Sequence, residues 1–199
     1  MHTRFLFVRH ATCAQTDSVL LGRRIDAPLD ARGEREAAEL AERLRRERPV
    51  RVEASPRLRA QQTAQAICAA TGLRLHVRAA LDEIDFGHWS GRRFDELALD
   101  PSWRHWNAER EHAVTPAGET IAGVQMRVLR LLRVLARRFA GATLVLVTHA
   151  EIVRSVLLHA LGAPAGDYRF VDVPPASLTV LHGGDGRLFA DAADLRMRA

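Results

Sequence analysis

Two histidines follow apolar runs that are typical of buried strands. His10 and its neighbour Arg9 come directly after residues 5–8, and His149 follows the run at 143–147. An imidazole can attack an electrophile or transfer a proton near neutral pH. A guanidinium can bind a phosphate group through paired hydrogen bonds. These residue types favour chemistry on a phosphate group.

A second arginine accompanies a third strand end. The short strand predicted at 50–54 ends at Ser55, and Arg59 lies one turn into the next helix. Ser55 and Pro56 are expected to start that helix as N-cap and first helical residue. Ligands of open α/β sheets bind beyond the carboxyl ends of the strands. We therefore expect both histidines and both arginines to meet at one edge of the sheet.

The elements that position these residues alternate between strands and helices. Helices are predicted at 31–48 (with Asp30 as N-cap), 56–70, 119–139 and 150–161. Strands are predicted at 5–8, 50–54, 73–77, 143–147, 177–181 and 187–190, the last two as a hairpin around 183–186. This alternation predicts an α/β fold, a three-layer sandwich in which a mostly parallel sheet is flanked by helices.

The length of 199 residues suits a single domain, residues 1–199. The segment 81–118 differs from the rest, because it is rich in Trp, His, Asp and Gly and has weak periodicity. We predict that it is a lid or insertion over the site, in which Trp103 and Trp106 pack. Glu119, which follows it, is either functional or an acid favoured by a helix N-terminus.

All 29 basic residues are arginine, and 24 acidic residues leave a formal charge of +5. The absence of lysine excludes mechanisms that need a P-loop or Schiff-base lysine. The charge alone would also fit nucleic acid or an anionic membrane. The other arginines, however, are scattered over helix faces such as that of 119–139, which is predicted to be solvated. We therefore predict a small substrate and neither nucleic acid nor a membrane as partner.

The two cysteines, Cys13 and Cys68, lie far apart in the chain, which argues against a zinc ribbon and a disulfide framework. Cys68 and Arg74 match the Cys-x5-Arg spacing of cysteine phosphatases, but Cys68 is expected to close a helix, so the match is interpreted as chance. His88, His105 and His112 have no compact metal-ligand spacing. No metal and no cofactor are predicted. The N-terminal apolar run is too short for a signal peptide, so we expect a cytoplasmic protein.

Five motifs in order along the chain resemble the histidine phosphatase superfamily, the phosphoglycerate mutase-like proteins. The family's Arg-His-Gly is matched by Arg-His-Ala at 9–11, and its Ser-Pro-x-x-Arg-Ala-x-x-Thr-Ala is intact at 55–64. The block Leu-x-Glu-x-x-x-Gly-x-Trp-x-Gly is matched at 81–91, Pro-x-Gly-Glu-Thr at 116–120, and Thr-His-Ala at 148–150 takes the place of Thr-His-Gly. The resemblance covers about residues 4–160 and implies the phosphoglycerate mutase-like fold.

The resemblance implies a role for each motif residue. His10 would be the nucleophile that forms a phosphohistidine, and Arg9, Arg59 and His149 would hold the phosphoryl oxygens. Glu83 would protonate the leaving alkoxide and later accept a proton from water. These five residues are the predicted catalytic group, and no metal is needed because the cationic side chains supply its charge.

The sequence departs from the family at three positions. Ala11 and Ala150 replace glycines beside the two histidines, which would strain the backbone if φ were positive there and would otherwise only narrow the pocket. We favour the second interpretation. Thr16 stands where relatives often have Asn near the substrate. Gly22 begins a stretch, residues 22–29, that also resembles the family. The predicted substrate-binding residues are Arg9, Arg59, Thr16, Gly22 and Ala150.

We predict a metal-independent phosphomonoesterase that acts on a small phosphorylated metabolite. The compact 81–118 segment resembles the phosphatase branch of the family, which includes the α-ribazole phosphatase type. It resembles the mutases less, because their chains are longer in this region. Phosphoglycerate mutase-type transfer is the first alternative, and a non-catalytic phospho-ligand binding module is the second. The sequence does not determine the oligomeric state, and a homodimer is among the states that it allows.

Overall fold

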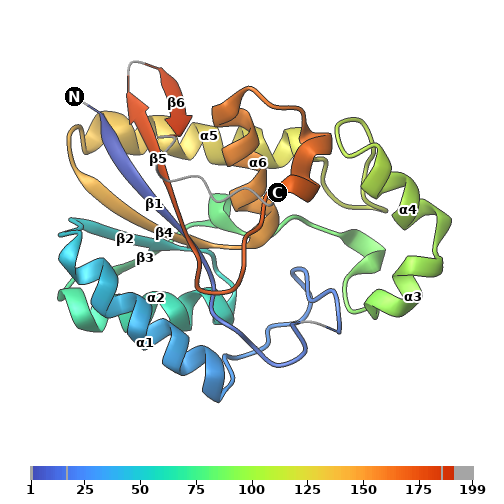
Figure 1. The fold of residues 1–199 in the computed structure, drawn as a ribbon, viewed down its shortest axis with the longest axis horizontal. Coiled ribbons are helices and arrows are strands. Elements are labelled where there is room, and N and C mark those ends of the chain that lie inside the picture. Colours follow the sequence, from blue (N-terminus) through green and yellow to red (C-terminus); the bar gives the residue numbers. More distant parts are fainter. Residues whose placement is uncertain (1, 17, 185, 191–199) are drawn as a thin grey trace.

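The computed structural model describes residues 2–16, 18–184 and 186–190. Its sheet has the order β3-β2-β4-β1-β5-β6 (Figure 1). The strands are β1 (Thr3–Arg9), β2 (Arg51–Ala54), β3 (Leu75–Val77), β4 (Thr143–Thr148), β5 (Leu178–Gly184) and β6 (Arg187–Ala190). β1 to β4 are mutually parallel, whereas β5 is antiparallel to β1 and β6 to β5. The predicted mostly parallel sheet is therefore confirmed.

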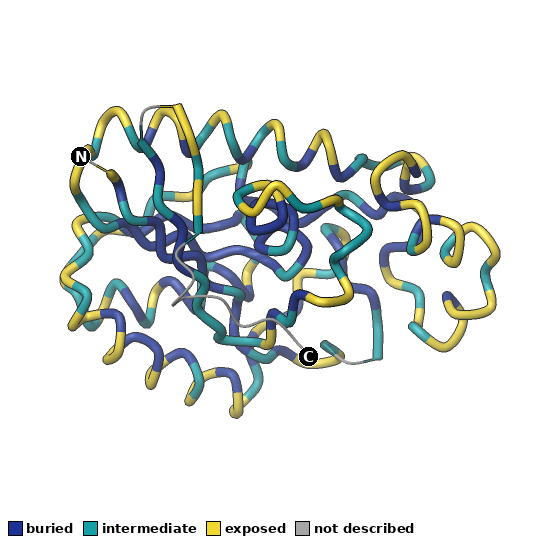
Figure 2. The backbone as a smooth tube through the Cα atoms, turned by 45° about the horizontal axis from the view of Figure 1, so that its top comes forward, coloured by how far each residue is buried: buried dark blue, intermediate teal, exposed yellow. Residues whose placement is uncertain are grey.

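Four long helices cover the two faces of this sheet. α1 (Ala31–Arg46) and α2 (Leu58–Thr71) lie on one face, and α5 (Ile121–Arg138) and α6 (Ala150–Leu161) on the other (Figure 1). One core cluster joins Leu44 of α1 to Val145 of β4, and another joins Val128 of α5 to Leu144 of the same strand. Alternate residues of β4 thus face opposite cores. Figure 2 shows the buried strands between more exposed helices, and the predicted three layers are confirmed.

Most helix boundaries agree with the sequence prediction, with two corrections. Asp30 caps α1 as predicted, through its side chain and the amide of Gly33. α2 does not start at Pro56; it begins at Leu58, and Ser55 is not its N-cap. The Ser55 hydroxyl instead contacts His149.

The segment 81–118 folds into short helices, of which α3 (Phe94–Leu99) and α4 (Pro101–Ala108) lie to one side of the sheet (Figure 1). The 3-10 turn η1 (Ala79–Leu81) leads into this segment, and the 3-10 turn η2 (Gly87–Trp89) lies within it. As predicted, Trp103 and Trp106 pack here: their rings stack at 5.4 Å and both also contact Trp89. This aromatic cluster gives the segment its own apolar interior despite weak sequence periodicity.

The remaining predictions concern the hairpin at 177–190, the thiol of Cys68 and membrane-spanning segments. β5 and β6 form the predicted hairpin, although Asp185 of its turn lies outside the described residues. Cys68 lies in the last turn of α2, and burial raises the pKa of its thiol, which does not suit a nucleophile. In the described part of the chain no helix is both long and apolar enough to span a membrane.

Candidate active site

The carboxyl ends of β1, β2 and β4 bring the predicted side chains together. These strands are neighbours in register, with Arg9 opposite Thr148 and Ala54 opposite Val147. His10, Ser55 and His149 each follow one of these ends. The two imidazole centroids lie 5.2 Å apart. Parallel pairing therefore produces the expected convergence at one sheet edge.

His10 is held as a neutral imidazole with a defined tautomer. Its Nδ1 lies 2.8 Å from the carbonyl oxygen of Ala11 and carries the proton, since a carbonyl can only accept. Its Nε2 then accepts from Nε of Arg59 at 3.2 Å. Burial lowers the pKa of His10 well below its usual value, and the charges of Arg59 and Arg9 lower it further. Nε2 thus keeps a lone pair at neutral pH.

Arg59 is fixed by contacts on every nitrogen. Besides His10, it contacts the carbonyls of Gly22 and Ile25, and its Nη2 lies 3.3 Å from Nδ1 of His149. Gly22 has a φ of +54°, and a Cβ there would lie 2.5 Å from the Ser90 hydroxyl oxygen. This backbone conformation and the close contact both favour glycine at this position, where its carbonyl anchors Arg59. The predicted residue Gly22 thus reaches the site through its backbone.

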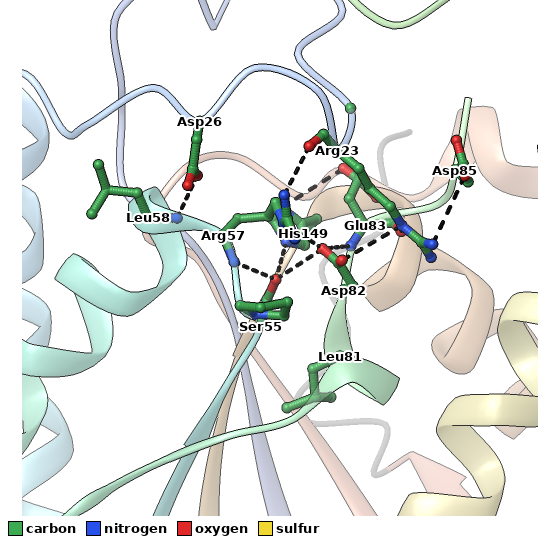
Figure 3. Close-up of polar contacts among 12 residues, drawn as sticks. Arg23, Asp26, Ser55, Arg57, Leu58, Leu81, Asp82, Glu83, Asp85 and His149 are labelled. Carbon is green, nitrogen blue, oxygen red and sulfur yellow. Dashed lines mark hydrogen bonds and ion pairs between the residues drawn. The ribbon is translucent and has the colours of Figure 1, made fainter. Parts of the chain in front are cut away.

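A buried chain of hydrogen bonds orients His149 (Figure 3). With Nδ1 facing the Arg59 donor, Nε2 carries the proton and donates to the Ser55 hydroxyl at 2.8 Å. Ser55 in turn donates to the carboxylate of Asp82 at 3.3 Å. Asp82 is paired with Arg57 at 3.0 Å and with Arg23 at 3.6 Å. His149 is therefore positioned as a neutral acceptor toward the centre of the site.

Glu83 lies beside the two histidines. Its Oε2 is 3.8 Å from Nδ1 of His149, and its Oε1 accepts from the amide of Ile84. Burial raises the pKa of Glu83 to about 7, with a further rise from the charge of Glu151 and an opposing effect from Arg59. Such a carboxyl can donate and accept a proton near neutral pH.

Two residues that the sequence interpretation did not place in the site, Arg127 and Arg23, hold the chain around Glu83 together with Glu119. Arg127 donates to the carbonyls of Ala80, Asp82 and Glu83, at 2.6, 2.8 and 3.1 Å. Arg23 donates to the Glu83 carbonyl at 2.7 Å. Both arginines pair with Glu119.

These contacts correct one expectation from the sequence and decide between the two alternatives left open for Glu119. The prediction of a solvated face is wrong for Arg127, whose side chain is only 19% exposed. Glu119 precedes Thr120, the N-cap of α5, and is an ion-pair partner rather than a first-turn acid. Its place in the Pro-x-Gly-Glu-Thr motif was the only sequence signal for this role.

A cavity of about 290 Å³ opens beside His10, Arg59 and Glu83. Its wall contains all the other predicted site residues except His149: Arg9, Thr16, Gly22 and Ala150. The segment 81–118 adds Phe86, Phe94, Trp103, Trp106 and Arg110. This volume suits a small ligand. A larger cavity of about 580 Å³ lies between α5 and the β5–β6 hairpin and contains none of the motif residues.

The remaining predicted residues differ in what they offer a ligand. Arg9 donates to the carbonyl of Val173 at 2.7 Å. The hydroxyl of Thr16 bonds to the backbone of Cys13, so it closes a local turn. Neither Ala11 nor Ala150 is among the described residues with positive φ. The backbone is therefore not strained at either alanine, as we favoured. Ala150 lines the cavity and Ala11 does not, so a narrower pocket stays a prediction for Ala150 alone.

The described residues contain no group of three His, Cys, Asp or Glu side chains that could hold a metal ion. His88, His105 and His112 are all exposed. What the site offers is one imidazole lone pair, buried guanidinium donors and a carboxyl poised near neutrality. That combination can stabilise a phosphoryl group while its bond to an alcohol is exchanged.

Comparisons with known proteins agree with this chemistry. The family model "Histidine phosphatase superfamily (branch 1)" matches residues 5–193. Phosphoserine phosphatase 1 of Hydrogenobacter thermophilus is 29% identical over 181 residues, 90% of this chain and 86% of that protein. A probable phosphoglycerate mutase, GpmB of Yersinia enterocolitica, is 30% identical, covering 79% of this chain and 74% of its own.

Solved structures and longer relatives complete the comparison. A mycobacterial glucosyl-3-phosphoglycerate phosphatase solved with VO3 superimposes with a TM-score of 0.84 at 23% identity, covering 97% of this chain and 99% of that one. At this identity the likeness concerns the fold. The chain spans only about half, 52%, of three mycobacterial relatives that are 30% identical to it.

Proposed function

The chain belongs to branch 1 of the histidine phosphatase superfamily and is a phosphatase by class, and on that premise we propose that it hydrolyses a small phosphomonoester through a phosphohistidine on His10. The observation that supports this most directly is the neutral His10, whose Nε2 lies 3.2 Å from the Arg59 guanidinium. A nucleophile and a phosphate-binding cation thus lie next to each other in the wall of the cavity.

The first half of the reaction transfers the phosphoryl group to the enzyme. The entering phosphoryl group takes over the Arg59 donors and frees the Nε2 lone pair of His10 to attack phosphorus. Arg9 and Arg59 hold the equatorial oxygens, where negative charge accumulates. His149 joins them once its Nδ1 also carries a proton, a state that the negative phosphoryl group favours. The N–P bond forms as the ester P–O bond breaks, and Glu83 gives its proton to the leaving alkoxide.

The second half regenerates the enzyme. Water attacks the phosphorus of the phosphohistidine, Glu83 accepts a proton from that water, and the N–P bond breaks to release inorganic phosphate. The pKa of Glu83, raised to about 7, suits both directions of proton transfer. No step requires a metal ion, because the guanidinium groups carry the positive charge.

The test uses an aryl phosphate in the presence of EDTA, with wild type beside His10→Ala. We expect phosphate release that survives chelation and is absent from the variant. Dependence on added metal would contradict the proposal. Specific binding of phosphate esters without any turnover would instead support the alternative of a non-catalytic binding module.

Phosphoglycerate mutase-type transfer is the second candidate, favoured by the relative named as a probable phosphoglycerate mutase. It requires that the phosphohistidine be discharged to a second alcohol rather than to water. Formation of an isomeric phosphoglycerate with no free phosphate would favour it. Within the phosphatases, the α-ribazole phosphatase type is the finer hypothesis, which assay of α-ribazole phosphate tests directly.

A further inference from the structure

The peptide unit between Ala11 and Thr12 has a partner at each end. Its carbonyl oxygen, which belongs to Ala11, accepts from Nδ1 of His10 at 2.8 Å. Its amide, which belongs to Thr12, donates to Oε2 of Glu36 at 2.9 Å. A trans peptide unit is planar, and its C=O and N–H bonds point in opposite directions. Glu36 therefore fixes the direction from which the carbonyl oxygen meets His10.

The start of α1 holds Thr12 at two further points. The Thr12 hydroxyl donates to the same Oε2 of Glu36 at 2.8 Å, and the Thr12 carbonyl accepts from the amide of Asp30 at 3.3 Å. Asp30 is the N-cap of α1, and Glu36 lies in the second turn of this helix. A Cβ on Gly33 would collide with the Thr12 carbonyl oxygen, so the helix and the loop are in direct contact. The chain after the nucleophile is thus held by a regular helix.

Glu36 is a strong acceptor for these donors. Burial alone would raise the pKa of its carboxyl, but the hydrogen bonds from the Thr12 amide and hydroxyl and from Arg32 bring that pKa below its ordinary value. Glu36 is therefore ionised at neutral pH. Arg32 pairs with Oε1 at 2.8 Å, so both carboxylate oxygens are occupied. Hydrogen bonds to a carboxylate are about twice as strong as those between neutral groups.

The other side of Ala11 is held by α2. The Ala11 amide donates to Oγ1 of Thr63 at 3.1 Å, and the Thr63 hydroxyl donates to the carbonyl of Arg59 at 2.8 Å. Ala11 and Thr63 are both completely buried. Because one amide is held by α2 and the next by α1, the Ala11 carbonyl cannot turn away from His10 unless one of these hydrogen bonds breaks.

We propose that Glu36 is a positioning residue for the nucleophile His10. Its carboxylate acts through the peptide unit at 11–12, whose carbonyl holds the Nδ1–H of the imidazole. Glu36 is not among the described residues that line the cavity beside His10, so its effect on the reaction passes through the backbone. This inference rests on the proposed phosphohistidine function.

The effect is expected at the step in which His10 attacks. As its Nε2 bonds to phosphorus, positive charge develops on the imidazole, because Nδ1 keeps its proton. The Nδ1–H then becomes a stronger donor, so the carbonyl that accepts from it stabilises the transition state more than the free enzyme. The Glu36 carboxylate polarises the peptide unit and strengthens this hydrogen bond, since consecutive hydrogen bonds strengthen one another. Loss of Glu36 should therefore slow phosphoryl transfer to His10.

The test uses Glu36→Ala and the isosteric Glu36→Gln. Arg32→Gln is the matched control, because it removes the exposed ion pair to Glu36 and leaves both Thr12 contacts in place. The measured quantity is kcat/KM for an aryl phosphate, which includes only the steps through release of the aryl alcohol and so reports the attack by His10.

The three variants are expected to differ in a defined order. Glu36→Ala should lose about tenfold or more in kcat/KM, and Glu36→Gln only about threefold, because its amide oxygen can still accept from Thr12. Arg32→Gln should keep the wild-type kcat/KM, since exposed ion pairs contribute little. Glu36→Asp keeps the charge but is one methylene shorter, and it replaces Glu36→Ala with the same expected loss if the alanine variant does not fold.

Two further measurements separate positioning from a general structural role. The inhibition constant of inorganic phosphate reports binding at Arg9 and Arg59, and it should be the same in every variant. The Nδ1–H proton of His10, observed by NMR in protein with 15N-labelled histidine, should exchange with water faster in Glu36→Ala than in wild type. His10→Ala identifies this signal.

The outcomes that contradict the proposal are distinct from those that contradict the phosphatase function. Wild-type kcat/KM in folded Glu36→Ala would overturn the positioning role, as would a Glu36→Gln variant as slow as Glu36→Ala. Equal losses of kcat/KM and of phosphate affinity would assign Glu36 a structural role only and would also overturn it. No hydrolysis of any ester by folded wild type would overturn the proposed function, and the exchange of the His10 proton would then still test the contact.

Discussion

The Nε2 atom of His149 lies 2.8 Å from the hydroxyl oxygen of Ser55. The Ser55 hydroxyl in turn donates a hydrogen bond to the carboxylate of Asp82, which forms ion pairs with Arg57 and Arg23. The chain of contacts fixes the imidazole proton on Nε2 and directs Nδ1 toward Arg59. A residue that the sequence placed at a helix start thus orients one of the two histidines.

Removal of this hydroxyl is expected to disturb His149 without unfolding the protein. Ser55→Ala leaves a buried N–H without an acceptor, at a cost of about 1–3 kcal/mol. We expect kcat to fall about tenfold with little change in KM, measured on an alkyl phosphate. Ser102→Ala, on the exposed side of α4, is the control. A folded Ser55→Ala with wild-type kcat would contradict the positioning role.

The pH dependence of the reaction is expected to follow Glu83. The acid form needed for the leaving group is present below a pKa of about 7, so the transfer step slows as the pH rises above 7. Alkyl phosphates should show this decline strongly, because their alkoxides leave poorly. Aryl phosphates should show it weakly. In Glu83→Gln, we expect about a hundredfold loss on alkyl phosphates and no decline near pH 7.

The same carboxyl should make stability depend on pH. The pKa of Glu83 is about 7 in the folded protein and 4.5 as its ordinary value, so the folded state binds the proton more tightly. Stability contributed by the protonated form is therefore lost as the pH rises from about 4.5 to 7. Above pH 7 the loss reaches about 3 kcal/mol.

Chemical denaturation of Glu83→Gln tests this linkage. Its advantage in unfolding free energy over wild type is expected to be about 3 kcal/mol larger at pH 8 than at pH 4. The exposed Glu42→Gln should show no such gain. A pH-independent difference between wild type and Glu83→Gln would show that the carboxyl titrates normally.

Arg127 is expected to matter for both stability and activity. It donates to three carbonyls of residues 80–83, and their loss in Arg127→Gln should destabilise the protein by about 2–3 kcal/mol. Because the chain carrying Glu83 would shift, kcat on alkyl phosphates should fall more than kcat on aryl phosphates. Arg130→Gln, on the same helix, is the control. Equal thermal unfolding of both variants would refute the anchoring role.

The sequence alone determined the frame of the site. Apolar runs of strand length end at His10 and His149, and parallel strands place their carboxyl ends at one edge, so chain order already implied that these residues meet. The alternation of strands and helices likewise determined the three layers. Helix starts were less certain, as Ser55 shows, because a hydroxyl that can cap a helix can equally bond to a distant imidazole.

Only the tertiary structure decided which charged residues are buried and what they contact. Arg127 and Arg110 look like further exposed arginines in an arginine-rich chain, and Asp82 is one of several acids beside Glu83. Arg127 donates to carbonyls 44 to 47 residues away, Arg110 pairs with Glu151 at a separation of 41, and Asp82 accepts from Ser55 at a separation of 27. No local periodicity encodes such separations. Burial then gives these pairs their effect, because a charge removed from water must be held by a specific counter-charge or hydrogen bond.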